Sequence, residues 1–206
     1  MQSAAKANVS AIGYHTLWCN GKRVDPTRVM EPGRTSTKHV FFSRFDLAPH
    51  LRQGRNVIAA SLGNGWEASD GNQPGSTQQP PAFYLDAMIT LAHTSSVADV
   101  GNLQTAVRVV TNTSWSSGLG AITYNSVYQG EWRDLRLSTP GWQSSTFDAS
   151  GWQAAELATT DKLLAEQTRP AVVELMVLKP TGDPRKINVS SQCDGAPGCH
   201  DTVCIR

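Results

Sequence analysis

The 206-residue sequence has no apolar run that approaches the ~20 residues of a membrane-spanning helix, so it predicts no membrane segment. It also lacks an excess of charge of either sign, because 18 Lys and Arg residues stand against 17 Asp and Glu residues. A chain with so little net charge has no strong field to hold nucleic acid, and it predicts no nucleic-acid partner. No long segment repeats its apolar positions with a helical period, which argues against a helical fold.

Motifs for catalysis are missing as well. The five histidines are scattered, with no i, i+4 pair, and none neighbours a Ser or Cys in a recognised nucleophile motif. Gly63-Asn64-Gly65 is followed neither by Gly-Lys-Ser nor by Gly-Lys-Thr, so it is no phosphate-binding loop. The sequence therefore contains no recognised nucleophile motif and no phosphate-binding loop.

No secretory signal is visible, because the first ten residues contain no apolar core. Three Asn-x-Ser/Thr sequons nevertheless favour an extracellular location, at Asn8, Asn112 and Asn188. Of the four cysteines, three lie near the C-terminus, at Cys193, Cys199 and Cys204. Their spacing contains no Cys-x-x-Cys pair and fits no zinc module, so it favours a disordered tail or a small disulfide knot. Cys19, in an alternating apolar segment, is predicted to be a buried thiol.

Short alternating segments separated by turn residues fill most of the chain. Residues 8–19 predict a strand, and Asn20-Gly21 predicts the hairpin turn that follows, because both central positions of that turn need a positive φ. Residues 56–62 are almost continuously apolar, as in a central strand that is covered on both faces. Further strands are predicted at 39–47, 83–93 and 105–112, with Asp46 capping a helical turn in between. The pattern predicts an all-β fold, an antiparallel jelly-roll-like β-sandwich of the galactose-binding-like type.

The stretch from Ile122 to Ala155 holds three of the six tryptophans, beside several acidic residues. Pro140-Gly141-Trp142 and Ser150-Gly151-Trp152 repeat the same turn ten residues apart. Gly and Pro interrupt helices and central strands, so each ring is expected on an irregular loop. A large ring there either closes the end of a sandwich or presents its face to a ligand. Trp115 and Trp152 are assigned to packing.

A series of these motifs resembles the N-terminal β-sandwich of bacterial-type α-L-rhamnosidases of glycoside hydrolase family 78. The motifs are Gly13-Tyr14, Asn20-Gly21-Lys22-Arg23-Val24, Leu62-Gly63-Asn64-Gly65-Trp66, Gly130-Glu131-Trp132-Arg133-Asp134-Leu135-Arg136, Pro140-Gly141-Trp142 and Phe147-Asp148-Ala149-Ser150-Gly151-Trp152. The chain departs from the family pattern at Asn64, Arg133 and Leu135, where the family usually has Asp, Tyr and Ala.

The resemblance implies a sandwich over residues 8–157, an extended linker or strand toward a next domain over 158–180, and an unmatched, irregular tail over 181–206. It also implies a non-catalytic, carbohydrate-associated accessory module of a longer rhamnosidase-like enzyme. The catalytic carboxylates of the family belong to a helical barrel that has no counterpart in these residues. The expected partners are rhamnose-containing glycans or glycosides and a catalytic barrel domain.

Aromatic, amide and carboxylate groups of the kind that bind sugars gather in the matching loops. The candidate carbohydrate-binding residues are Asn64, Trp66, Asn125, Tyr128, Glu131, Trp132 and Asp134. Some modules of the family bind L-rhamnose together with calcium, which makes Asn64, Asp70 and Asn72 candidate calcium ligands. No other cofactor is expected.

Two alternatives to a sugar-binding module stay open. In a purely structural sandwich, the rings would close the core, Glu131 would accept backbone N–H bonds at a bend, and Asp134 would pair with Arg136 or Arg133. In an active glycosidase, Glu131 and Asp134 would have to serve as the acid and base, and nothing in the sequence raises one pKa while leaving the other low.

Overall fold

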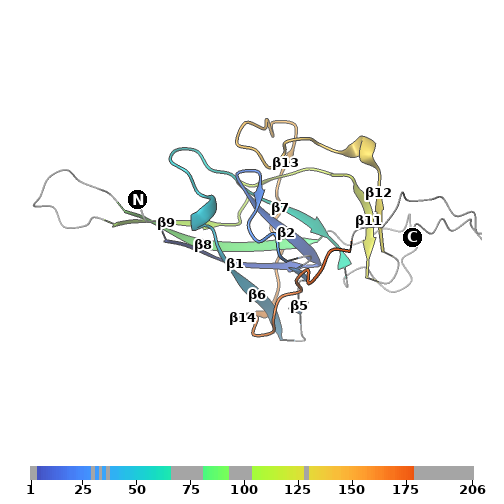
Figure 1. Ribbon diagram of the computed structural model, residues 1–206, viewed down its shortest axis with the longest axis horizontal. Coiled ribbons are helices and arrows are strands. Elements are labelled where there is room, and N and C mark those ends of the chain that lie inside the picture. Colours follow the sequence, from blue (N-terminus) through green and yellow to red (C-terminus); the bar gives the residue numbers. More distant parts are fainter. Residues whose placement is uncertain are drawn as a thin grey trace, which may run out of the picture. The chain divides into compact units, whose positions relative to one another are not determined.

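The computed structural model describes residues 4–28, 31–32, 34–35, 38–65, 81–92, 104–127 and 130–178. Contacts divide the chain into two units, Met1–Val173 and Glu174–Arg206. All the strands of the described residues lie in the first unit (Figure 1). Of the second unit, only residues 174–178 are described, and their side chains are exposed. Within the described ranges, no helix is long and apolar enough to cross a membrane.

The larger sheet is built around β1 (Ala4–Ile12). Its order is β14-β6-β1-β8-β9, and β5 also pairs with β6. Every pairing is antiparallel except that of β14 with β6, which is parallel. The other strands of this sheet are β5 (Arg34–Thr35), β6 (His39–Asp46), β8 (Ala82–Ala92), β9 (Gln104–Val110) and β14 (Leu163–Glu166).

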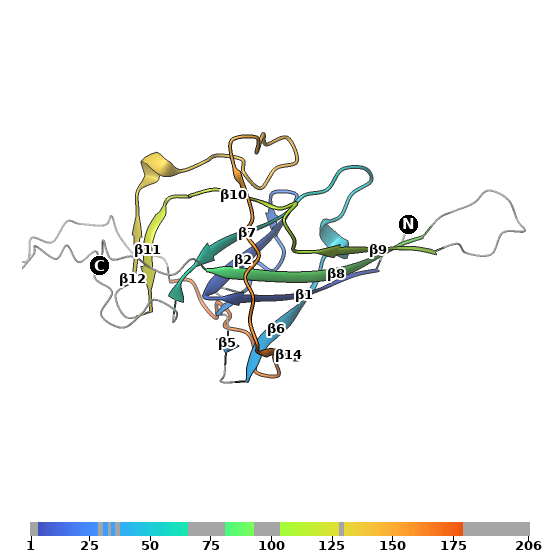
Figure 2. The ribbon, with the colours of Figure 1, turned by 180° about the vertical axis from the view of Figure 1, so that it is seen from behind.

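The second sheet is built around β2 (Tyr14–Cys19), and Figures 1 and 2 show β2 and β7 over β1 and β8. Around β2 lie β3 (Lys22–Arg23), β4 (Glu31–Pro32) and β7 (Ile58–Gly63). Two small antiparallel pairs complete the strands: β10 (Ser116–Ser117) with β13 (Gln153–Ala154), and β11 (Ile122–Ser126) with β12 (Gly130–Arg133). Two short 3-10 helices are η1 (Ala48–His50) and η3 (Leu135–Leu137).

The core lies between these two sheets, which makes the fold the predicted all-β sandwich. In β1 the alternate residues Ala5, Ala7 and Val9 have no exposed surface, as expected when one face of a strand is buried. The facing strand β2 buries Leu17 and Cys19 in the same way. The core cluster consists of Ala5, Ala7, Val9, Leu17, Cys19, Val24, Phe45, Leu47, Leu85 and Ala87.

The prediction of one continuous strand over 8–19 is wrong, because the chain changes sheets at Gly13. This residue has a φ of 105°, and a Cβ on it would lie 2.2 Å from the backbone oxygen of Gly63. Only glycine combines that conformation with so close an approach of two backbones. β1 and β2 therefore enter opposite layers of the sandwich although they are consecutive in sequence.

The predicted Asn20-Gly21 hairpin is confirmed. Asn20 and Gly21 have φ angles of 52° and 80°, and Cys19 lies opposite Lys22 in the register of β2 and β3. Cys19 is fully buried as predicted, and burial raises the pKa of its thiol. Asp46 accepts a hydrogen bond from the backbone N–H of Ala48 at 3.0 Å, at the start of the predicted helical turn.

β7 is not the fully covered central strand that its apolar sequence predicted. Among the described residues it pairs only with β2, and its side chains from Ile58 to Leu62 are half-buried. The end of β7 instead meets the hairpin of β11 and β12, where Val127 donates its N–H to the backbone oxygen of Gly65 at 3.3 Å. Contact with this hairpin supplies part of the covering that a second neighbouring strand would give.

β14 lies inside the predicted linker 158–180. It pairs with β6 from Leu163 opposite His39 to Glu166 opposite Phe42, and Glu166 forms an ion pair with Arg44 at 2.9 Å. The boundaries 8–157, 158–180 and 181–206 stay a prediction. The predicted tail and its three cysteines are outside the described residues.

Replacing Gly21 by Val is expected to destabilise the fold by at least ~1 kcal/mol, because a β-branched residue is strained at the φ of 80°. No atom lies within 4 Å of a Cβ at this site, so the cost would be conformational and not steric. Thermal or urea unfolding measures it. Gly151→Val is the matched control, since Gly151 is equally open and has no positive φ. Equal stability of the two variants would contradict the hairpin assignment.

Candidate carbohydrate-binding site

The hairpin of β11 and β12 carries most of the described candidate residues. Its register places Tyr124 opposite Trp132 and Asn125 opposite Glu131. Side chains directly opposite each other share a face, whereas successive side chains of a strand point to opposite faces. The aromatic pair and the amide–carboxylate pair therefore lie on different faces, so the hairpin divides the predicted set of residues.

Asn125 attaches the hairpin to the end of β7. Its side chain is buried, its Oδ1 accepts the backbone N–H of Gly65 at 2.9 Å, and its Nδ2 donates to Glu131 Oε2 at 3.2 Å. A buried amide that is bonded at both ends holds its neighbours firmly, because leaving either end unbonded would be costly. This contact brings three of the predicted residues to one place: Asn64, Asn125 and Glu131.

The two glycines beside Asn64 make this contact possible. A Cβ on Gly63 would lie 2.9 Å from Asn125 Oδ1, and a Cβ on Gly65 would lie 2.8 Å from the ring of Tyr14. The Gly-Asn-Gly sequence is therefore a place of close approach between segments. This role was not predicted from the sequence, although an isolated glycine at a strand end is a signal of it.

Trp132 lies on the other face of the hairpin and is 55% exposed. It packs edge-to-face against Tyr124, with ring centroids 6.4 Å apart and an angle of 63° between the rings. Tyr124 itself is buried at 4% exposure. Trp132 therefore does not close the core; a buried ring supports it while much of its own surface faces solvent.

The two acidic residues of the hairpin are held by arginines. Glu131 accepts from Asn125 and forms an ion pair with Arg133, and its expected role of accepting backbone N–H bonds stays a prediction. Asp134 pairs with Arg136 at 2.6 Å, as the structural alternative predicted, and accepts the backbone N–H of Arg136 at 3.0 Å. These bonds hold the pKa of Asp134 below its ordinary value, whereas a glycosidase general acid needs a raised one.

The remaining candidates cannot be placed in the same way. Trp66 and Tyr128 lie outside the described residues, as do the proposed calcium ligands Asp70 and Asn72. In the described part of the chain, no group of three or more His, Cys, Asp or Glu side chains could hold a metal ion. The calcium site stays a prediction, because Asn64 is the only one of its three proposed ligands among the described residues.

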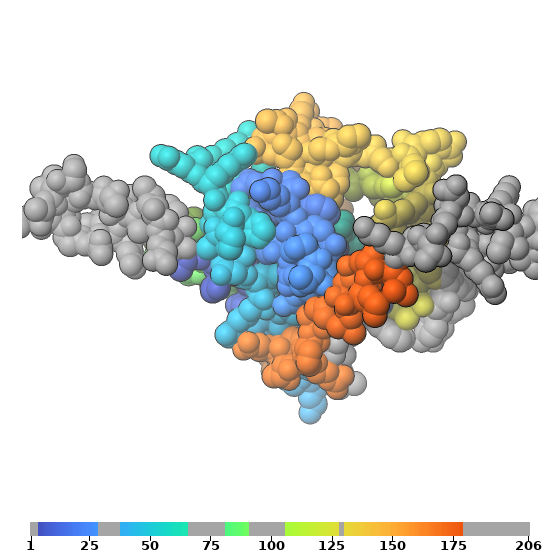
Figure 3. Space-filling model, in the orientation of Figure 1, coloured from blue at the N-terminus to red at the C-terminus, as the bar shows by residue number. Residues whose placement is uncertain are grey.

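The tryptophans assigned to packing are placed accordingly. Trp152 contacts Phe147 and Trp142, with centroids 5.2 and 6.4 Å apart, and Trp142 reaches Trp18 of β2 at 6.3 Å. In Figure 3 the gold residues around 141–152 lie against the blue residues of β2 and β3. Trp115 donates its ring N–H to the backbone oxygen of Val110 at 3.1 Å and packs against the core.

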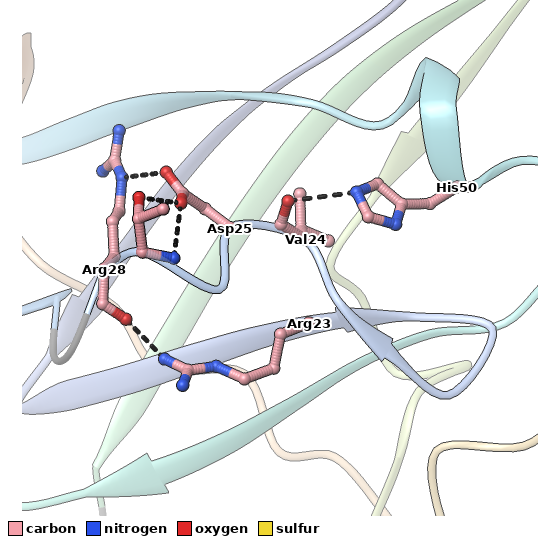
Figure 4. Close-up of polar contacts among 6 residues, drawn as sticks. Arg23, Val24, Asp25, Arg28 and His50 are labelled. Atoms are coloured by element: carbon pink, nitrogen blue, oxygen red, sulfur yellow. Dashed lines mark hydrogen bonds and ion pairs between the residues drawn. The ribbon is translucent and has the colours of Figure 1, made fainter. Parts of the chain in front are cut away.

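A second polar cluster follows β3 and is shown in Figure 4. Asp25 accepts from the backbone and hydroxyl of Thr27 and pairs with Arg28 at 3.0 Å. Burial alone would raise the pKa of Asp25, but these bonds outweigh it and leave the pKa below its ordinary value. The guanidinium of Arg28 lies 4.4 Å from the ring centroid of Phe45. Asp25 therefore holds Arg28, whose guanidinium connects the loop to Phe45 of β6.

The same cluster continues to η1. Arg23 donates to the backbone oxygen of Arg28, and the His50 ring lies 3.0 Å from the backbone oxygen of Val24 (Figure 4). A cavity of about 10 Å³ beside it is lined by His15, Thr16, Leu17, Arg23, Asp25, Arg28 and Phe45. That is about the space of one water molecule, which is too small for a sugar. The cluster is a structural element, and the hairpin remains the candidate site.

Comparison with known proteins places these observations in a family. The family model described as the α-L-rhamnosidase N-terminal domain matches residues 2–175. An α-L-rhamnosidase of Formosa agariphila is 25% identical over an aligned length of 185 residues, and the alignment covers 85% of this chain and 18% of that protein.

Two solved structures have a similar fold. The α-L-rhamnosidase of Streptomyces avermitilis complexed with L-rhamnose superposes with a TM-score of 0.62 at 28% identity, over 78% of this chain and 15% of that one. The native enzyme of Aspergillus terreus has a TM-score of 0.62 at 25% identity, over 79% of this chain and 18% of that one. The chain thus spans less than a fifth of the length of these proteins.

Replacing Gly63 by Ala is expected to displace Asn125 and to destabilise the domain by about 1–3 kcal/mol through overpacking. Chemical denaturation measures the loss, and Gly120→Ala is the control, because a Cβ at Gly120 meets no atom within 4 Å. Asn125→Ala removes the side-chain oxygen that a Cβ at position 63 would meet. In a double-mutant cycle, the stability cost of Asn125→Ala should therefore be smaller in the Gly63→Ala background than in the wild-type chain. Additive effects would show that Gly63 and Asn125 do not interact.

Proposed function

The chain belongs to the α-L-rhamnosidase N-terminal domain family, and on that premise we propose that it is a carbohydrate-binding accessory module. Its ligand is L-rhamnose, free or at the end of a glycan or glycoside. The module carries no catalytic residue and serves an α-L-rhamnosidase-like enzyme by holding rhamnose-containing substrate near the catalytic domain.

The single observation that carries this proposal is the exposure of Trp132. A tryptophan that is 55% exposed, and supported from one side by a buried tyrosine, offers the flat apolar surface on which the C–H face of a sugar ring stacks. A ring needed only for packing would be covered, as Trp115 is by the core cluster.

Polar groups for the hydroxyls of the sugar lie on the same hairpin. Asp134 follows β12 directly, and Asn125 and Glu131 are bonded to each other on the face opposite Trp132. One monosaccharide cannot contact both faces, so we propose that Trp132 and Asp134 bind one end of the ligand. The segment where the hairpin meets the end of β7, beyond this end of the ligand, is then shaped by Asn64, Asn125 and Glu131. The similar enzyme of Streptomyces avermitilis forms a complex with L-rhamnose, which supports the choice of sugar.

A second candidate is a structural role, in which the module packs against another domain. Two leucines of η3 favour it: Leu135 is 73% exposed and Leu137 is 49% exposed. Large apolar side chains so close to an exposed tryptophan have the composition of an interface core. The two candidates differ in what Trp132 contacts, a sugar or a protein surface.

Isolated chain is expected to release no rhamnose from an aryl rhamnoside. Its two candidate acids are both paired with arginine, and Asp134 has a lowered pKa. Release of the aryl group, followed by absorbance, is the measurement. Activity that persists through repurification and disappears in Glu131→Gln would contradict the non-catalytic role.

L-Rhamnose is expected to bind weakly, with a Kd on the order of micromolar to millimolar. An exposed surface for one small sugar has few desolvated contacts, which limits the binding free energy to roughly 4–8 kcal/mol. Trp132→Ala should abolish the binding heat in calorimetric titration and leave the melting temperature unchanged. If calcium takes part, a chelator should lower the affinity reversibly.

Trp152→Ala is the matched control, because Trp152 packs against Trp142 and Phe147. It should lower the melting temperature and leave the affinity of the folded protein unchanged. Asn64→Ala should weaken binding if that loop helps to shape the site. A Trp132→Ala variant that melts earlier, in a chain that binds no monosaccharide, would favour the structural candidate.

A further inference from the structure

We propose that Asn112 is an acceptor of an N-linked glycan when the chain passes through a glycosylating secretory pathway. The inference does not rest on the proposed function. It starts from the three sequons of the sequence, two of which lie in the described residues, at Asn8 and Asn112.

Asn112 lies in an exposed turn that directly follows β9. Asn112, Thr113 and Ser114 are all exposed. Oδ1 of Asn112 accepts the backbone N–H of Ser114 at 2.8 Å, which is an Asx turn. Because the oxygen of the amide faces this turn, its nitrogen, which is the atom that would be modified, is directed away from it.

The neighbours of Asn112 anchor the turn on both sides, while Asn112 itself is exposed. Before it, Thr111 donates its N–H to the backbone oxygen of Leu85 at 3.0 Å. After it, Trp115 donates its N–H to the backbone oxygen of Asn112 at 3.2 Å and packs with Phe83 at a centroid distance of 5.9 Å. The sequon is therefore a fixed, projecting feature of the surface.

Asn8 has the same type of sequon in an opposite environment. It lies within β1, with Arg44 directly opposite on β6 and Asp86 directly opposite on β8. Both neighbours are in ion pairs, and Asp86 is paired with Arg108 at 2.8 Å. The hydroxyl of Ser10, the third residue of the sequon, is buried and donates to the backbone oxygen of Phe41 at 2.7 Å. A glycan at Asn8 would crowd this row of paired side chains.

The modification uses a polyprenyl-pyrophosphate-linked oligosaccharide as donor. The amide nitrogen of Asn112 forms a bond to the anomeric carbon, and the bond from that carbon to the pyrophosphate oxygen breaks. The polyprenyl pyrophosphate leaves with the bonding electron pair, and the amide nitrogen loses one proton. No oxidant or reductant is needed.

The test is secretion of the full chain from yeast behind a cleavable signal, followed by peptide-N-glycosidase digestion in heavy-oxygen water. Trypsin separates the three sequons, because it cleaves after Lys6, Arg108 and Lys186. The peptide that begins after Arg108 should carry the heavy-oxygen label at position 112, and the peptide with Asn8 should carry none. Mass spectrometry reads both peptides from one sample.

Three variants keep the test decisive. Asn112→Gln and Ser114→Ala should both lose the label at position 112, and Ser114→Thr should keep it. Ser114→Ala retains the backbone N–H that closes the Asx turn, so it decides the outcome if Asn112→Gln fails to fold. Secreted wild-type protein without label at Asn112, or with equal label at Asn8, would overturn the proposal.

Discussion

The position of the candidate site depends on the buried side-chain amide of Asn125. Among the described residues, β11 and β12 pair only with each other, and an isolated two-stranded hairpin is marginally stable in water. Asn125 bonds the hairpin to the backbone of Gly65, and the N–H of Val127 adds a second bond to the same glycine. The orientation of Trp132 therefore follows from a contact made on the opposite face of the hairpin.

The turn and core positions could be predicted from the sequence because they depend on local chemistry. Asn20-Gly21 has one favourable hairpin conformation, and the alternating residues of β2 have one apolar face. The change of sheet at Gly13 could not be predicted, because it depends on the backbone of Gly63, which is distant in sequence. The apolar run of β7 was misleading for a similar reason: its composition does not show that, among the described residues, only β2 pairs with it and a hairpin meets its end.

The candidate site was predictable as a set of residue types, and only in part as an arrangement. Asp134 and Arg136 are two residues apart, so their pairing followed from the sequence. The separation of Glu131 from Trp132 onto two faces depends on the register of β11 with β12, which no local pattern shows. The two tryptophans were separated at the sequence level: Trp152 was assigned to packing and packs in an aromatic cluster, whereas Trp132 was a candidate site residue and is 55% exposed.

The parallel pairing of β14 with β6 has a consequence for biosynthesis. β6 ends at Asp46, but the strand that covers one edge of its first half is complete only when Glu166 has been added. At a synthesis rate of roughly 5–20 residues per second, that edge stays open on the order of ten seconds. An unpaired edge is a template for wrong pairing with another chain, so this interval is when the nascent domain most needs protection by a chaperone.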